Sequence, residues 1–390
     1  MKNAPQFIPL GESVELIMGQ APPSKDCNSN GRGTPFVKVG EFRETRPEIR
    51  EWTTNPLRMA RRTDVLLCVV GATCGKINLG EDCAIGRSVA AIRPNISKLD
   101  QFYLYYFMMT LVERLRSGSV GAAQTVISKD MIEAVQFPFV PLPEQQRIVG
   151  ILDEAFDDIA IAKANADKNL QNARALLESY LHSVFTQHGD GWTEKTLDDV
   201  CQQITDGKHG DCADENGSGF YFLSAKDVKA GTLNYENARQ IKRPDFEETH
   251  RRTNLEPGDI LITNSGTIGR MAIAPSDPKT RNTTFQKSVA ILKLIRTAID
   301  SKYAFYCLSS GLTRFVNLSA GAAQKNLLLR DLRSYRFALP ERLEQQRMIA
   351  ANLDNFSEQT KSLESIYQQK LAALTELKKS MLHQAFTGAL

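Results

Sequence analysis

The feature that most constrains the fold of this chain is an internal repeat. The tetrapeptide EQQR occurs at Glu144–Arg147 and again at Glu344–Arg347. The hexapeptide RSVAAI at 87–92 matches KSVAIL at 287–292, and both pairs of matches are offset by the same 200 residues. Chance does not keep several matches in the same order and at the same distance. The 390-residue chain therefore consists of two copies of one structural unit.

Each copy divides into a mixed head and a helical segment. The heads, residues 1–143 and 189–340, contain short β-rich runs interrupted by Gly, Pro and Asn, and a helical stretch that follows an aspartate in N-cap position. The segments 144–188 and 341–390 contain no proline and almost no glycine, which is typical of long helices. The predicted fold class is α+β, with two repeated mixed α/β domains separated by two long helices.

Apolar residues recur at heptad spacing along both helical segments, which indicates a coiled-coil seam. We expect the helices to pair with each other in an antiparallel coiled coil, which gives a single chain pseudo-twofold symmetry. The alternative is that each helix packs against its own head. The residues expected in the seam include Ile148, Leu152 and Ile159 in the first helix and Ile349, Leu353 and Leu363 in the second.

Composition and cysteine use narrow the class of protein. Hydrophobic residues make up 42% of the chain and charged residues 24%, as in ordinary soluble proteins. No apolar stretch approaches the roughly 18 residues that a membrane helix requires, and the N-terminal stretch contains no apolar h-region, so we expect no secretory signal. The seven cysteines are odd in number and form no CxxC pair, so we expect reduced thiols, no metal site and a cytoplasmic location.

The net charge of +3 is too small to indicate a nucleic-acid partner by itself. Basic residues nevertheless cluster in both heads, for example at Arg58, Arg61 and Arg62 and again at Arg251 and Arg252. Such a cluster is more often only a solvated face. Two basic heads at opposite ends of a helical rod, however, have the geometry for reading two half-sites along a duplex.

The chain lacks the motifs of the common enzyme classes. GATCGK at Gly71–Lys76 resembles a phosphate loop, but its glycines are one residue too close together and Ile77 stands where a magnesium-binding Ser or Thr is needed. A tight strand-to-strand turn is the better interpretation of this segment. Neither HExxH nor GxSxG occurs, so we predict no catalytic residue and no enzymatic activity for this chain.

Taken together, these motifs resemble the specificity (S) subunit of Type I restriction–modification systems. The matching pieces are two heads that each end in GAAQ, at Gly121–Gln124 and Gly321–Gln324, and are then followed by the EQQR helix opening. The GQAPPSK turn at Gly19–Lys25 and the TDGKHG loop at Thr205–Gly210 match as well. The resemblance covers essentially the whole chain, and its most specific parts are the two EQQR openings.

The resemblance implies a non-catalytic subunit whose heads are target recognition domains, each reading one half of a bipartite site in double-stranded DNA. It implies that the long helices set the unread spacer and dock two modification (methyltransferase) subunits, with restriction subunits joining that core. S-adenosylmethionine, ATP and Mg²⁺ are then expected on the partner subunits, and no cofactor on this chain. The doubled helix opening follows from this interpretation, because two copies of one partner must be recruited.

No rule converts the residues of the heads into bases, so we predict DNA contacts from loops that contain Gly and Lys or Arg. Arg87 and Lys287 have an alternative structural role, with their stems along the strand. For Gln124 and Gln324 three roles stay open: contact with DNA, contact with a partner subunit, or formation of a turn. The predicted DNA contacts are Ser24, Lys25, Lys38, Arg43 and Arg87 in the first head, and Lys208, His209, Lys226, Arg270 and Lys287 in the second. Partner docking and helix pairing are assigned to Glu144, Gln145, Arg147, Glu344, Gln345 and Arg347, together with the seam residues named above.

Two rival classes make different demands on the sequence. A self-contained nuclease or methyltransferase requires catalytic motifs, such as the Asn-Pro-Pro-Tyr of adenine methyltransferases, and none is found. A scaffold with lectin-like or adhesin heads requires a secretion signal and paired cysteines, and the sequence shows neither.

Overall fold

A computed structural model describes residues 6–117, 126–187, 191–229, 231–311 and 326–390. The chain forms two compact units: residues 1–167 with 368–390, and residues 168–367. Each unit therefore contains one head together with a part of each long helix. Gln124 and Gln324 lie outside the described residues.

The head of the first unit is built on a four-stranded antiparallel sheet, β2-β10-β7-β8, and a five-stranded sheet, β3-β5-β4-β9-β6. A third sheet pairs β1 with β11 next to the start of the long helix. The bounds are β1 Gln6–Pro9, β2 Val14–Met18, β3 Cys27–Asn28, β4 Thr34–Val37, β5 Glu51–Thr53, β6 Met59–Ala60, β7 Val65–Cys68, β8 Ile77–Leu79, β9 Cys83–Ile85, β10 Val89–Pro94, α1 Gln101–Ser117, α2 Lys129–Glu133 and β11 Gln136–Phe139.

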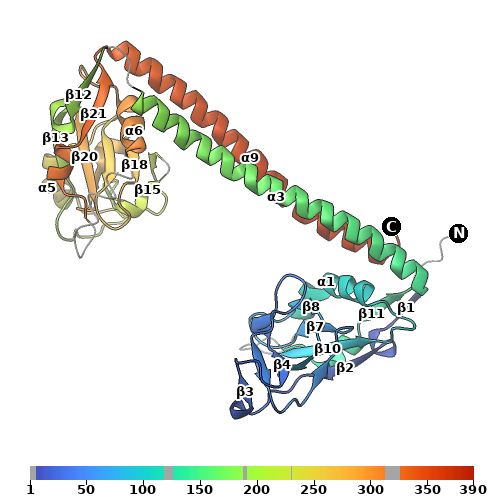
Figure 1. Ribbon diagram of the computed structural model, residues 1–390. Coiled ribbons are helices and arrows are strands. Elements are labelled where there is room, and N and C mark those ends of the chain that lie inside the picture. The colour runs from blue at the N-terminus through green and yellow to red at the C-terminus, as the bar shows by residue number, and fades with distance from the viewer. Residues whose placement is uncertain (1–5, 118–125, 188–190, 230, 312–325) are drawn as a thin grey trace. The chain divides into compact units, whose positions relative to one another are not determined.

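Strand β7 explains why the run DVLLCVV is apolar at almost every position. Val65 and Leu67 pack into the core that contains helix α1, whereas Leu66 and Cys68 pack into a second core shared with the five-stranded sheet. Successive side chains of a strand point to opposite faces. The four-stranded sheet is thus the middle layer of the head, with α1 along one face (Figure 1).

The second unit repeats this arrangement within itself. Its four-stranded antiparallel sheet, β13-β20-β17-β18, has the strand order of the first head. Its smaller sheets are β12-β21, β14-β19 and β15-β16. The bounds are β12 Trp192–Thr196, α4 Leu197–Val200, β13 Cys201–Asp206, β14 Tyr221–Leu223, β15 Val228–Lys229, β16 Thr232–Leu233, α5 Arg243–Thr253, β17 Ile260–Thr263, β18 Met271–Ile273, β19 Thr283–Phe285, β20 Val289–Leu294, α6 Ser301–Ser310, α8 Leu329–Arg333 and β21 Arg336–Pro340.

The aspartates expected to cap the head helices do so in both copies. The Asp100 carboxylate accepts hydrogen bonds from the backbone N–H groups of Phe102 and Tyr103 at 2.8 and 3.0 Å. The Asp300 carboxylate accepts the equivalent bonds from Lys302 and Tyr303 at 3.0 and 3.1 Å. Each cap satisfies N–H groups that the first turn of a helix leaves without an intrahelical partner.

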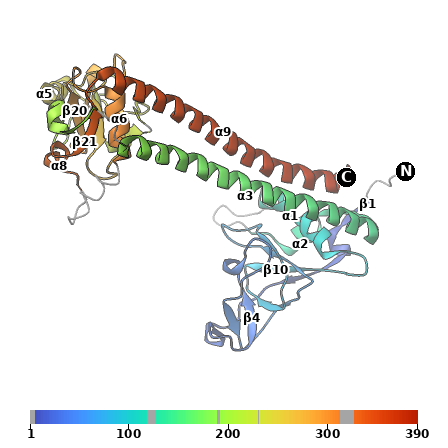
Figure 2. The same ribbon diagram turned by 45° about the horizontal axis from the view of Figure 1, so that its top comes forward.

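The two long helices, α3 (Leu142–Thr186) and α9 (Leu343–Thr387), each contain 45 residues (Figures 1 and 2). In the first unit the start of α3 meets the end of α9, where Leu152 shares a core with Phe386. In the second unit the end of α3 meets the start of α9, where the Tyr180 and Phe356 rings are 4.4 Å apart. The predicted antiparallel pairing is confirmed within each unit, although α3 also packs on its own head through Leu152.

The predicted seam is correct for α3 and partly wrong for α9. Ile148, Leu152 and Ile159 are all buried, at no more than 5% exposure. In α9, Leu353 is buried and Ile349 is half-buried, but Leu363 is 42% exposed. The buried line along α9 passes through Ala350, Ser357 and Thr360 and reaches the half-buried Glu364, one position beyond the predicted leucine. A heptad template favours the most apolar residues, whereas this part of the seam is lined by small and polar ones.

The EQQR openings contain a second departure from expectation, because their matching letters are not structurally equivalent. Gln145 is fully buried: its Oε1 accepts from the backbone N–H of Asp100 at 2.8 Å, and its Nε2 donates to the carbonyls of Lys98 and Val140 at 2.9 and 2.8 Å. Gln345, its partner in the sequence repeat, is not buried.

Gln346 takes the buried place in the second copy. It accepts from the Asp300 N–H at 2.9 Å and donates to the carbonyls of Ala298 and Pro340 at 3.2 and 2.8 Å. One extra residue before α9 shifts the offset from 200 to 201, as the helix starts Leu142 and Leu343 also show. The predicted partner-docking role of Gln145 is therefore corrected: this side chain joins the head to the long helix.

A tyrosine and an aspartate reinforce each junction. The Tyr106 hydroxyl donates to Asp153 in the first unit, and the Tyr306 hydroxyl donates to Asp354 at 2.7 Å in the second. Burial and the nearby carboxylates raise the pKa of both tyrosines, which keeps their hydroxyls as donors. Each head is thus attached to its helix by buried polar contacts as well as by apolar packing.

Two further expectations concern local structure and membranes. GATCGK forms the connection between the antiparallel strands β7 and β8, with the Gly75 N–H bonded to the Cys68 carbonyl at 2.8 Å, so the predicted turn is confirmed. Among the described residues, no helix has the length and apolar character to span a bilayer.

Candidate nucleic-acid interface

A glycine begins the predicted DNA-contacting loop in each head. Gly19 follows β2 and donates its N–H to the Val89 carbonyl at 2.9 Å, and Gly207 follows β13 and donates to the Val289 carbonyl at 3.3 Å. A Cβ atom would lie 2.2 Å from the Gly86 carbonyl oxygen at the first position and 2.0 Å from the Phe285 oxygen at the second. Only glycine fits, so each loop turns closely over the segment that carries Arg87 or Lys287.

In the first head, three of the predicted DNA contacts line one cavity. Ser24, Lys38 and Arg87 surround a concavity of about 900 Å³, together with Val70 and Ser88 among others. The Lys38 ammonium lies 2.5 Å from the Glu51 carboxylate, whereas the Arg87 side chain is exposed. An open cavity with an exposed guanidinium suits an anionic ligand such as a nucleic-acid backbone or a base edge.

The other two predicted residues of this head lie elsewhere. Lys25 is exposed beside Ser24. Arg43 donates to the Glu48 carboxylate at 2.8 Å and to the carbonyls of Gly40 and Phe42 at 3.1 and 3.0 Å. Because these contacts fold its own loop, Arg43 has a structural role in this structure, and its contact with DNA stays a prediction.

The second head has a cavity at the corresponding place. Its volume is about 240 Å³, and His209 and Lys287 from the predicted set line it. The His209 Nε2 atom lies 3.1 Å from Asp206, while Lys287 is exposed. Asp206, Asn264, Ser265 and Asn326 complete the polar part of the wall.

Lys208 departs most clearly from the predicted role. Its ammonium donates to Asp245 at 2.9 Å and to Glu248 at 3.0 Å, and only 15% of the side chain is exposed. These two carboxylates raise its pKa, so the side chain stays charged and bound to them. Lys208 therefore fastens the loop to helix α5. Lys226 and Arg270 are exposed, and their contact with DNA stays a prediction.

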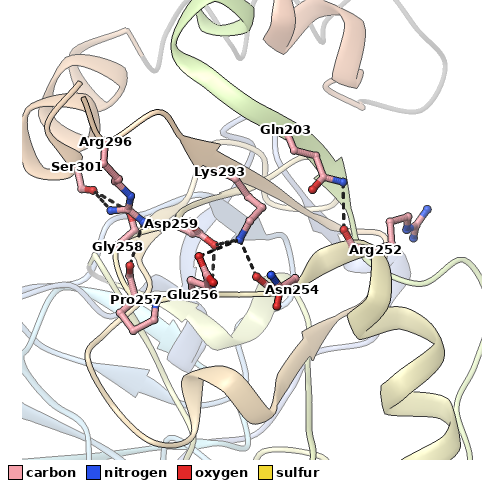
Figure 3. A network of polar contacts seen from close by, with 10 residues as sticks. All are labelled: Gln203, Arg252, Asn254, Glu256, Pro257, Gly258, Asp259, Lys293, Arg296 and Ser301. Carbon is pink, nitrogen blue, oxygen red and sulfur yellow. Dashed lines mark hydrogen bonds and ion pairs between the residues drawn. The ribbon is translucent and has the colours of Figure 1, made fainter. Parts of the chain in front are cut away.

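A network of charged and polar contacts in the second head joins neighbouring strands of its sheet (Figure 3). Lys293 donates to the buried Asp259 at 2.8 Å, and Arg296 approaches the same carboxylate at 3.2 Å. Burial raises the pKa of Asp259 in spite of these two cations. In the first head Arg93 and Asp64 form the equivalent pair at 3.0 Å. Each pair ties the central strand to the start of the neighbouring one.

The remaining residues of the helix openings are surface groups. Arg147 pairs with Glu144 at 2.7 Å in the first copy, and Arg347 lies 3.8 Å from Asp300 in the second. Glu344 is exposed. Their predicted contact with partner subunits stays a prediction. In the part of the chain that the structure describes, no group of three His, Cys, Asp or Glu side chains is arranged to hold a metal ion.

A family model described as the Type I restriction modification DNA specificity domain matches residues 5–171 and 189–372, which is most of the chain. The chain belongs to this family. Each of the two matched ranges spans one head and the first part of the long helix that follows it.

Individual relatives agree with this assignment. The chain is 31% identical over 180 residues to a protein of Methanocaldococcus jannaschii named for the specificity subunit of type I restriction enzyme MjaX; the match covers 45% of this chain and 42% of that protein. It is 21% identical over 410 residues to the type I restriction enzyme EcoBI specificity subunit of Escherichia coli, covering 98% and 85% of the two chains.

Two solved structures share the fold over the full length. One, from a study of complex assembly and conformational transition of the type I R-M system, has a TM-score of 0.82 at 18% identity and covers 100% of this chain and 99% of its own. The HsdS subunit of Thermoanaerobacter tengcongensis has a TM-score of 0.66 at 18% identity and covers 100% and 98%. The predicted fold class is confirmed.

The cavity wall of the second domain contains polar residues that were not predicted from the sequence. Asp206, Asn264 and Asn326 line the cavity of the second domain, yet none is basic and none was singled out from the sequence. The sequence feature that could have indicated Asn264 is its location, because it is a polar residue directly after the buried strand β17. The retained cation in each cavity, Arg87 or Lys287, was selected by the repeat.

Proposed function

We propose that this specificity subunit reads a bipartite DNA site, with one half-site bound by each head, and carries out no chemistry of its own. The observation that carries the proposal is a concavity at the same place in both heads. Each keeps one exposed cation, Arg87 or Lys287, while the rest of its wall differs. A shared cation suits the phosphate backbone that every site presents, and a different wall suits a different base sequence.

The long helices are proposed to set the spacer between the half-sites and to dock two modification subunits. Buried contacts through Gln145 and Gln346 attach each head to its own helix, which supports a fixed angle at each junction. Exposed apolar side chains on α9, Met348 and Ile366 among them, are candidates for contact with a modification subunit. These two residues are separated by about five helical turns and therefore share one side of α9.

The chemistry is proposed to reside on the partners. Modification subunits would bind S-adenosylmethionine and methylate adenine, and restriction subunits would use ATP and Mg²⁺. This chain would select the target sequence on double-stranded DNA. We propose no membrane partner.

Reconstitution tests the proposal. The purified chain alone is expected to neither methylate nor cleave DNA, whereas its mixture with the cognate modification subunit should methylate adenine at one bipartite sequence. The readout is methylation mapped by sequencing. Methyl transfer by the chain alone, or methylation by the mixture at sequences without a bipartite motif, would overturn the proposal.

A further inference from the structure

The two cavities share a backbone framework and differ in side chains. The N–H of Val69 donates to the Ser88 carbonyl at 2.9 Å, and the N–H of Asn264 donates to the Ser288 carbonyl at 3.0 Å. Val70 and Ser265 then form matching bridges to residues 126 and 326. These contacts make Asn264, Ser265 and Asn326 the structural counterparts of residues 69, 70 and 126 in the first head.

The counterparts change from apolar to polar. The first head has valine at positions 69, 70 and 126, where the second has Asn264, Ser265 and Asn326. Of these valines, Val70 lines the cavity of the first head, whereas all three polar counterparts line that of the second. Strand register adds a further pair, because Met18 and Asp206 both lie opposite the first alanine of their partner strands. The cation is the part that stays, as Arg87 or Lys287.

Asn264 is a residue of this wall with an unused hydrogen-bonding group. Its backbone is fully engaged, since its N–H bonds to Ser288 and its carbonyl accepts from the Leu327 N–H at 2.8 Å. Its side chain is 8% exposed, lines the cavity, and has an amide oxygen without a hydrogen-bond partner. A buried acceptor without a donor is costly, and the cost is relieved when a donor reaches it.

We propose that Asn264 is a base-reading residue of the second half-site and that it selects an A·T pair. The inference rests on the proposed function of the heads. In the major groove, adenine presents an amino donor at N6 beside an acceptor at N7. The asparagine amide offers the complementary oxygen and N–H₂, and its terminal torsion is soft enough to turn the amide toward the base. Lys287, exposed on the same wall, then neutralises a neighbouring phosphate.

Three substitutions test this role in the complex with the cognate modification subunit. Asn264→Val installs the residue type of the first head, which the same backbone accommodates at Val69. Asn264→Asp keeps the size and the acceptor but replaces the N–H₂ donor with a second acceptor. Asn216→Ala, at an exposed asparagine of the same head that is not part of the cavity wall, is the matched control.

The readout is the methylated motif, followed by binding to duplexes that vary each base pair of the second half-site. With Asn264→Val, discrimination at one A·T pair should fall by about 10- to 100-fold, with the first half-site and the spacer unchanged. With Asn264→Asp, the preference at that pair should move toward cytosine, whose N4 amino group is a donor without an adjacent acceptor. The control should keep the parent motif.

The outcomes separate this inference from the proposed function. If the parent complex methylates a bipartite motif but both Asn264 variants keep every preference in the second half-site, Asn264 does not read a base. If the valine variant loses all binding, its thermal unfolding shows whether it is folded, and the aspartate variant is then used to test the inference. A folded aspartate variant that keeps the parent preference at every position also overturns the inference. If the parent itself recognises no bipartite motif, the proposed function fails first.

Discussion

The shifted register at the helix openings yields a prediction that sequence alignment alone would get wrong. The repeat aligns Gln145 with Gln345, whereas the structure makes Gln145 equivalent to Gln346. We therefore expect Gln145→Ala and Gln346→Ala to be destabilising. We expect Gln146→Ala, at an exposed position, and Gln345→Ala to have little effect.

The magnitude of the effect follows from the hydrogen bonds that each substitution removes. Each buried glutamine side chain makes three hydrogen bonds to backbone groups. At a net value of about 1 kcal/mol for each bond, its removal costs about 3 kcal/mol in the free energy of unfolding of its own unit. An exposed substitution stays within about 0.5 kcal/mol.

Hydrogen exchange measures this effect unit by unit, which a single melting temperature of a two-unit chain does not. The reporters are the amides of Asp100 and Asp300, which donate directly to the two glutamines. A loss of about 3 kcal/mol accelerates exchange by about a hundredfold. Acceleration in Gln345→Ala comparable to that in Gln145→Ala, with Gln346→Ala silent, would refute the register.

Three further predictions concern the buried pair, the loop glycine and the long helices. Lys293→Met should lower the stability of the second unit by about 3–5 kcal/mol because it leaves Asp259 buried without its closest cation. Adding Asp259→Asn should recover most of this loss, as measured by urea unfolding, and a double variant no more stable than the single one would contradict the prediction. Gly19→Ala should destabilise the first unit by about 1–3 kcal/mol, since its Cβ would meet the Gly86 carbonyl. In the control Gly40→Ala the added Cβ meets no atom within 4 Å, so this variant should be neutral. Equal melting temperatures for the two variants would be evidence against the close approach at Gly19. Adding seven residues to both α3 and α9 at matched levels keeps the seam in register and adds about 10 Å of helix. The affinity, measured across duplexes of varied spacer length, should then peak at a spacer up to about three base pairs longer, and binding should be weaker because the second half-site turns by about 100° around the duplex. An unchanged optimum would mean that the helices do not set the spacer.

The architecture could be predicted from the sequence because the repeat and the helix patterns are both properties of many residues at once. Two heads, two long helices and their antiparallel pairing follow from patterns that a single misassigned residue does not disturb. The position of Leu363 did not follow, because a heptad template selects apolar residues, while this seam contains the buried Ser357 and the half-buried Glu364. The exact register of the second opening was hidden by one inserted residue.

The candidate site was predictable in part, and most clearly where the repeat marked it. Arg87 and Lys287 were found because both copies keep a cation there, and the structure places each in its cavity wall. Lys208 has the same residue type, but Asp245 and Glu248 bind it from helix α5, which comes much later in the chain. Asn264 was missed since its significance depends on burial and an unpaired oxygen, neither of which a sequence displays.

Exchange of one head tests most directly whether each head reads its own half-site. Residues 190–338 would be replaced by the equivalent head of a relative with a known motif, and the methylated sites of the chimera with the modification subunit would be mapped by sequencing. We expect one half of the motif to change to that of the relative while the other half and the spacer stay as in the parent. A change in both halves, or in neither, would contradict the independent reading of the two half-sites.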